Sequence, residues 1–267
     1  MAIRKATETR PTAAEPDTFD SHPGAASTTP GRVFMLPFAG ASAFAFGPLL
    51  PSGGSADRDR FVQIALPGHV ERMKEPLLDD LEAIAAESFY QIADRLGPHD
   101  VVYGHSMGAL LALLVVRRAR SLLMPLPGAL VVSGMRAPSE ILQGGRHALP
   151  ADALKAELQR LGGTPEDVLR NDEIFAFFEP LIRADFKAVE TWAYRAEPPL
   201  PVPITVLSGR DDDTPPETLA QWQAETTFPI AQRQFDGGHF FIFDHPDAIR
   251  SVLLDALGKA ATCPTPQ

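Results

Sequence analysis

The sequence predicts an α/β fold in which a mostly parallel sheet is flanked by helices. Short apolar segments typical of buried strands alternate with helical or loop segments along the chain. That alternation favours parallel strands covered on both faces. A chain of 267 residues with 45% hydrophobic content is also long enough for one large core plus an insertion.

Six strands are expected in order, near residues 32–36, 60–65, 100–104, 129–133, 203–208 and 230–235. Residues 142–200 contain no good strand and instead have helical spacing. The expected core is therefore 31–141 and 201–258, interrupted by a helical insertion. One face of that insertion carries apolar residues, namely Ile174, Phe178, Leu181, Ile182, Phe186, Val189 and Trp192. Pro180 is expected to start a second helix or to kink one.

The two ends of the chain and its composition limit the other possibilities. Residues 1–30 and 259–267 have little apolar content or are rich in Pro, which predicts mobile tails. A net charge of -10 argues against nucleic acid or an anionic membrane as a partner. The single cysteine, Cys263, excludes an intramolecular disulfide and is consistent with a reducing cytoplasm. No apolar run is long enough to predict a membrane span.

The segment Gly104-His105-Ser106-Met107-Gly108 follows a strand-like run and precedes the helix-forming residues 109–114. This pattern is typical of a nucleophile elbow, in which glycines on both sides leave space for a serine on a tight strand-to-helix turn. A serine hydroxyl is a weak nucleophile until a neighbouring base activates it. Ser106 is therefore the predicted nucleophile, provided that a base and an acid follow in the chain.

The expected order is serine, then an acid after a later strand, then a histidine after the last strand. His239 follows the glycine pair 237–238 at the end of the last expected strand and is the predicted base. Three consecutive aspartates follow the strand at 203–208. Asp212, three residues after Gly209, is favoured as the acid, with Asp211 as the alternative. The aspartates are also compatible with a solvated turn that caps the helix starting near residue 215.

The other histidines are weaker candidates for the base. His105 is expected to pack beside the serine, because adjacent residues on a turn point apart. His245 precedes a proline at an expected helix start and is interpreted as structural. His69 lies in a loop without catalytic spacing.

An acyl-transfer site also needs backbone N–H groups for the developing oxyanion. The amide of Met107 is one expected donor. The other is expected from the loop after the first strand, where Ala39 is the candidate and Phe38 the reserve. No metal site and no cofactor-binding site are predicted.

Taken together, these motifs resemble those of the type II thioesterases of polyketide synthase and nonribosomal peptide synthetase systems, within the α/β-hydrolase superfamily. The elbow contributes to the resemblance, and so do segments 36–40 (LPFAG), 66–72 (LPGHVER), 161–166 (LGGTPE), 183–186 (RADF), 198–199 (PP) and 237–241 (GGHFF). The chain departs from the family at three positions. Phe38 replaces a usual His, Ala41 a usual Gly, and His69 a usual Arg.

The resemblance implies an α/β-hydrolase fold whose helical insertion forms a lid and shapes an acyl channel above Ser106. It implies hydrolysis of acyl thioesters on the phosphopantetheine arm of acyl or peptidyl carrier proteins, with no cofactor of the enzyme's own. Because carrier proteins are commonly acidic, a basic patch is expected, formed by Arg117, Arg118 and Arg120 or by Arg136, Arg146 and Lys155. A general serine esterase without carrier dependence remains the alternative.

Overall fold

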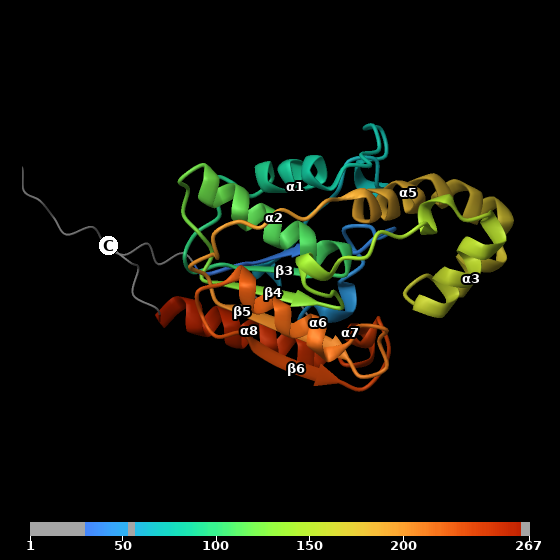
Figure 1. Cartoon of the computed structure of the whole chain (residues 1–267). Helices are drawn as coiled ribbons and strands as arrows, with labels where there is room; N and C mark the ends of the chain where they lie inside the picture. Colours follow the sequence, from blue (N-terminus) through green and yellow to red (C-terminus); the bar gives the residue numbers. More distant parts are fainter. Residues whose placement is uncertain (1–29, 53–56, 263–267) are drawn as a thin grey trace, which may run out of the picture.

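The computed structural model describes residues 30–52 and 57–262, and its centre is a six-stranded sheet (Figure 1). The strands are β1 (Val33–Leu36), β2 (Phe61–Gln63), β3 (Val101–His105), β4 (Ala129–Ser133), β5 (Ile204–Gly209) and β6 (Ala231–Phe235). Their order is β2-β1-β3-β4-β5-β6, and every neighbouring pair is parallel. The predicted α/β class and all six predicted strands are confirmed.

Alternating side chains of the strands face two separate apolar layers. In β1, Phe34 and Leu36 join the core that contains α1 (Leu81–Tyr90) and α2 (Met107–Ser121), whereas Val33 and Met35 join the core that contains α8 (Pro246–Thr262). This division follows from the two-residue period of a strand. Because helices cover both faces, the central strands β1, β3, β4 and β5 are buried and mostly apolar.

Three helices lie between β4 and β5, namely α3 (Ala151–Leu161), α4 (Glu166–Arg170) and α5 (Asp172–Thr191). Figure 1 shows that the strands point toward the end of the molecule where α3 and α5 lie. These three helices are called the lid below. Their position over the carboxyl ends of the strands is where α/β folds form their ligand sites.

Pro180 neither starts a second helix nor ends one, because α5 runs through it without a break. Proline cannot donate to the carbonyl of Ala176 one turn earlier. Ala176 is exposed, so water can satisfy that carbonyl and the cost of the missing hydrogen bond is small.

The remaining elements are short. They comprise α6 (Pro216–Ala220), α7 (Phe241–Asp244) and the 3₁₀ turns η1 (Gly47–Leu49), η2 (Arg58–Arg60), η3 (Val70–Arg72), η4 (Pro138–Glu140), η5 (Arg146–Ala148) and η6 (Gln221–Glu225). Among the described residues, no helix has both the length and the apolar character needed to cross a membrane.

The last helix is longer than the sequence predicts. Residues 259–262 were expected to belong to a loose tail, but α8 continues to Thr262. Ala260 is buried and packs beside Gly128, so an apolar contact extends the helix by a turn. The expected tails at 1–29 and 263–267 lie outside the described residues.

Two glycines allow β3, α2 and β1 to approach one another at the elbow. A Cβ atom on Gly104 would lie 1.9 Å from the carbonyl oxygen of Gly108, and one on Gly108 would lie 2.1 Å from the carbonyl oxygen of Leu36. Both obstacles are backbone atoms, which cannot move aside as a flexible side chain can. Glycine is therefore required at both positions by packing.

We expect Gly108→Ala to destabilise the protein by about 1–3 kcal/mol or more, because a methyl group is forced against backbone. Gly258→Ala is the matched control: it lies on α8 with nothing within 4 Å of the added Cβ. That change should stabilise by about 0.5–1 kcal/mol through helix propensity. Urea denaturation of both variants measures the difference, and equal stabilities would contradict the packing argument.

Candidate active site

Ser106 lies between the end of β3 and the start of α2, in a conformation that residues with side chains rarely adopt. Its φ is 53° and its ψ is -122°. Its amide donates to the carbonyl of Ser133 at 2.8 Å, which ties the turn to the end of β4. Strained backbone of this kind persists where the surrounding structure imposes it, and it is common at functional sites. The strain turns the hydroxyl toward the cavity beneath the lid.

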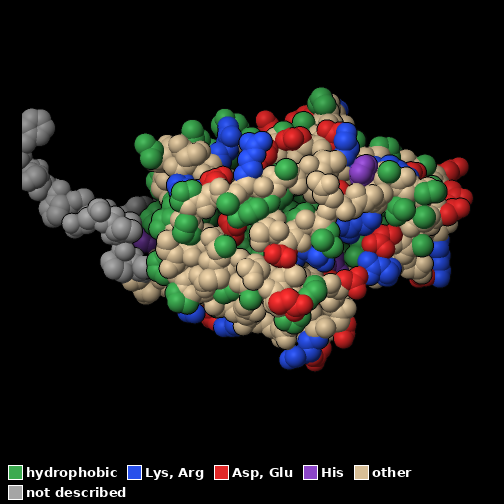
Figure 2. All heavy atoms as spheres, viewed as in Figure 1, with side chains coloured by type: hydrophobic (Ala, Val, Ile, Leu, Met, Phe, Trp, Pro, Cys, Tyr) green, Lys and Arg blue, Asp and Glu red, His purple; other side chains and the backbone are tan. Residues whose placement is uncertain are grey.

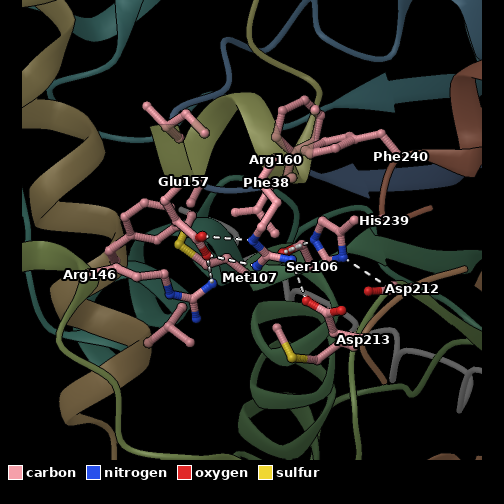
Figure 3. A pocket seen from close by; sticks show the side chains of 18 of the residues that line it. Phe38, Ser106, Met107, Arg146, Glu157, Arg160, Asp212, Asp213, His239 and Phe240 are labelled. Carbon is pink, nitrogen blue, oxygen red and sulfur yellow. Dashed lines mark hydrogen bonds and ion pairs between the residues drawn. The ribbon is translucent and has the colours of Figure 1, made fainter. Parts of the chain in front are cut away.

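A continuous hydrogen-bond chain joins Ser106 to His239 and Asp212 (Figure 3). The Ser106 hydroxyl lies 3.0 Å from Nε2 of His239, and Nδ1 of that ring lies 3.1 Å from Oδ2 of Asp212. A carboxylate only accepts hydrogen bonds, so Nδ1 carries the proton and Nε2 is free to accept from the hydroxyl. The Asp212 side chain is only 6% exposed, which limits competition from water.

The loops that carry His239 and Asp212 are joined by backbone hydrogen bonds that extend the β5–β6 ladder. Beyond the two strands, the amide of Arg210 donates to Phe235 and the amide of Asp211 donates to Gly237. Gly209 permits this approach, because a Cβ there would lie 2.3 Å from the carbonyl oxygen of Gly238. Two side chains 27 residues apart in sequence are thereby brought into contact.

Among the three aspartates, only Asp212 contacts the histidine in the described part of the chain. Asp211 is exposed, and Asp213 forms an ion pair with Arg160 of the lid. The structure thus separates the favoured candidate from the alternative that the sequence left open.

His105 and His245 occupy structural positions. His105 is fully buried and its Nδ1 lies 2.9 Å from the hydroxyl oxygen of Ser133. Burial, together with the nearby His239, holds the pKa of His105 well below its usual value, so the ring is neutral. His245 Nε2 donates to the carbonyl of Asp236.

Both expected oxyanion donors, Met107 and Ala39, line the same cavity as Ser106. Phe38, the reserve, also lines it and closes a turn by accepting from the amide of Ala41. The amide of Gly40 is already engaged, because it donates to Asp185 at 2.7 Å. Among the described residues, the Ala39 amide has no hydrogen-bond partner, which leaves it available to a ligand.

The Ser106 cavity measures about 270 Å³, and an adjoining, more apolar cavity measures about 360 Å³. Four residues line both: Phe38, Ala39, Leu158 and Thr164. From the apolar residues expected on one face of the lid, Phe186 and Val189 line the first cavity, and Phe178 and Ile182 line the second. Ile174 instead is 40% exposed.

Phe38, one of the three departures from the family pattern, sits in an aromatic cluster beside the triad. Its ring packs edge-to-face against Phe240 at 4.8 Å and against His105 at 5.9 Å. It therefore gives the Ser106 cavity an apolar wall, where a histidine would add a polar one.

Charged residues of the lid face the triad across the cavity (Figure 3). Arg160 binds Glu157 on its own helix and Asp213 beside the triad, and these two partners raise the pKa of its guanidinium. The lid therefore contacts the triad loop through an ion pair.

Glu190, on lid helix α5, is a buried acid. Burial alone would raise its pKa, but hydrogen bonds from His147 and Arg146 outweigh that effect and lower the pKa.

The structure removes Arg117 from the first predicted basic patch and pairs Arg120 with an acid. Arg117 is buried and paired with Glu225, and Arg120 is paired with Glu197. Arg118 lies over the ring of Tyr90. Because Arg117 and its partner are both buried, Arg117 cannot serve as an exposed docking charge, and the prediction is wrong for this residue.

In the second patch, Arg146 and Lys155 are paired with acids as well. Arg136 lines the Ser106 cavity and has no ion-pair partner among the described residues. Figure 2 shows Lys and Arg side chains interspersed with Asp and Glu on the visible face.

Sequence reasoning missed a buried contact between His69 and Asp185. Nε2 of His69 lies 2.9 Å from Oδ2 of Asp185, and both side chains are almost completely buried. The only signal was the presence of each residue in a family motif, which does not reveal that the two touch.

In the described portion of the chain, no three His, Cys, Asp or Glu side chains are arranged to bind a metal ion.

Comparison with known proteins agrees with this geometry. The chain is 35% identical to a probable cadicidin biosynthesis thioesterase from Streptomyces griseus over 91% of its own length and 66% of that protein's. It is 34% identical to thioesterase PikA5 from Streptomyces venezuelae, over 85% of this chain and 80% of that one.

Among solved structures, BorB, a type II thioesterase from the borrelidin biosynthetic cluster, matches with a TM-score of 0.78 and 35% identity. That match covers 87% of this chain and 94% of BorB. Residues 31–257 match the family model of the thioesterase domain. The chain therefore belongs to the thioesterase family, as its motifs predicted, and its relatives include type II thioesterases of biosynthetic clusters.

Proposed function

We propose that this protein is a type II, editing thioesterase that hydrolyses acyl thioesters on the phosphopantetheine arm of acyl or peptidyl carrier proteins. The observation that carries the proposal is the unbroken hydrogen-bond chain from Ser106 through His239 to Asp212, in a member of the thioesterase family. A hydroxyl held by an oriented imidazole is the arrangement that activates serine for acyl transfer.

In the first half of the reaction, the Ser106 oxygen attacks the thioester carbonyl while its proton passes to Nε2 of His239. The negative charge that develops on the carbonyl oxygen is stabilised by the amides of Met107 and Ala39. Asp212 keeps the imidazole in the required tautomer and stabilises its protonated form. The C–S bond then breaks, the thiol leaves with the proton from His239, and the acyl group remains on Ser106.

In the second half, His239 takes a proton from water as the water oxygen attacks the acyl-enzyme. The same two amides stabilise the second oxyanion. The C–O bond to Ser106 breaks, the serine recovers its proton from His239, and the free acid departs. No cofactor is needed in this scheme, because phosphopantetheine enters only as part of the substrate.

Two further features support the choice of a carrier-bound substrate. Relatives carry names from biosynthetic clusters, and the two adjoining cavities give a partly apolar space beneath the lid. A long pantetheine arm can deliver an acyl group to such a buried site. Arg136, which has no ion-pair partner in the described structure, is a cation available to an acidic carrier at the cavity. We include a cytoplasmic location in this proposal, because a chain with a single cysteine is consistent with a reducing compartment.

Ser106 should react selectively with a sulfonyl fluoride, because the triad activates its hydroxyl. We expect His239→Ala to abolish labelling, since the base is lost. His99→Ala, whose ring lies at the other end of the sheet near the Ala260 carbonyl, should label like the wild type. Mass spectrometry of the elbow peptide measures the modification, and equal labelling of both variants would refute the assigned base.

Asp212→Asn should lower kcat by about 10⁴-fold while leaving the fold intact, because the imidazole adopts the wrong tautomer. Asp211→Asn is the matched control, since that neighbouring carboxylate is exposed. Steady-state hydrolysis of an aryl ester compares the two variants. A larger loss for Asp211→Asn would reassign the triad acid.

Carrier dependence is tested with one acyl group presented on a carrier protein, on CoA and on an aryl alcohol. We expect kcat/KM to be highest for the carrier-bound thioester, and we expect Arg136→Ala to reduce that advantage without changing the aryl ester rate. Mass spectrometry of the carrier before and after exposure gives the carrier rate. Equal values for all three substrates would favour the general esterase instead.

A further inference from the structure

Asp185 joins three segments that are far apart in sequence. It lies on lid helix α5 and is completely buried. Its Oδ2 atom accepts from the amide of Gly40, in the loop after β1, at 2.7 Å. The same oxygen lies 2.9 Å from Nε2 of His69, in the loop after β2. One carboxylate oxygen thus connects the lid to the loop that carries the expected oxyanion donor Ala39.

The His69 ring is held as a cation by its two partners. Nδ1 lies 3.1 Å from the carbonyl oxygen of Pro67, which can only accept, and Nε2 faces the Asp185 carboxylate. Both nitrogens therefore donate, which requires the imidazolium form. Burial alone would lower the pKa of His69, but the hydrogen bond and charge of Asp185 outweigh it and raise that pKa. Glu71 in the same loop acts in the same direction.

Gly40 is the point at which this pair acts on the oxyanion loop. The turn from Phe38 to Ala41 has Gly40 at φ +78°, a conformation that glycine adopts without strain. The Gly40 amide belongs to the peptide unit directly after Ala39. Fixing that unit against Asp185 fixes the orientation of the turn, and with it the direction of the preceding Ala39 amide toward the Ser106 cavity.

A purely structural role explains this arrangement poorly. Oδ1 of Asp185 is buried without a hydrogen-bond partner in the described residues, which is a costly state for a carboxylate oxygen. Well-packed apolar side chains are often at least as stabilising as a buried ion pair. The carboxylate supplies what an apolar side chain cannot, an acceptor shared by the Gly40 amide and the His69 ring.

We propose that His69 and Asp185 are positioning residues that hold the Ala39 amide in place for the oxyanion, so that the oxyanion site is complete only while α5 is docked. This inference rests on the proposed function, because it assigns Ala39 to the reaction. His69 orients and neutralises Asp185, Asp185 orients the Gly40 peptide, and the lid thereby takes part in the catalytic geometry without touching the reacting atoms.

The first test compares Asp185→Ala with Glu225→Ala, which removes an equally buried carboxylate from its pair with Arg117, away from the site. Loss of a whole oxyanion donor costs about 10²–10³ in kcat. We therefore expect Asp185→Ala to lower kcat by about 10–100-fold, with KM within about threefold. The affinity for a boronic acid, whose adduct with Ser106 carries a tetrahedral oxygen, should fall by the same factor. Glu225→Ala should lower the melting temperature but leave kcat within about twofold.

Milder variants keep the proposal testable if Asp185→Ala does not fold. His69→Gln removes the charge and should lower kcat, whereas His69→Arg keeps a permanent cation and should restore it. In the wild type, the cation is present at low pH and is lost as pH rises through the raised pKa of His69, so kcat should fall on the alkaline side. That alkaline fall should disappear in His69→Arg, and it should also be absent in His69→Gln, whose kcat should be low over the same alkaline range.

The inference is overturned if Asp185→Ala changes kcat no more than Glu225→Ala, if only KM changes, or if wild type and His69→Arg lose kcat identically at high pH. The thioesterase proposal fails in a different way. A wild type that cleaves the aryl ester but no thioester would refute that substrate class, while the comparison of variants on the aryl ester and on boronic acid binding would still decide the role of the pair.

Discussion

The hydrogen bond between Ser106 and His239 depends on one constraint, the parallel alignment of all six strands. Because every strand points the same way, the loops after β1, β3, β5 and β6 all emerge at one edge of the sheet. The strained turn at Ser106 and the side chains of Asp212 and His239 are thus far apart in sequence but joined by hydrogen bonds in space. If the register of β5 against β6 slipped by one residue, the side chains would change faces and the chain of hydrogen bonds would be lost.

Electrostatic contacts link the lid to this edge at two places. Arg160 reaches Asp213 next to the triad acid, and Asp185 reaches Gly40 next to the expected oxyanion donor. The first contact is exposed and is weakened by water and salt, whereas the second is buried and keeps its strength. Because Arg160 lies on α3 and Asp185 on α5, the positions of these two lid helices are coupled to the loops that carry Asp212 and Ala39.

Much of this organisation could be predicted from local patterns. Alternating apolar segments located all six strands, and the order of serine, acid and histidine identified three side chains that prove to be in contact. The errors arose where burial depends on a distant partner. From the sequence, Arg117 was expected to be an exposed charge, but it is buried and paired with Glu225. The end of α8 was expected to be a loose tail, but Ala260 packs beside Gly128 and the helix continues.

By itself, the sequence determined the fold class, the strand order along the chain and the candidates for nucleophile and base, because periodicity and turn chemistry are local properties. Only the tertiary structure decided which of three adjacent aspartates meets His239. A shift of one residue along the loop changes which carboxylate faces the histidine. It also decided that His69 and Asp185 form a pair 116 residues apart, since no local pattern records which buried charges will meet. Long-range packing selects such contacts, and it acts on the folded chain as a whole.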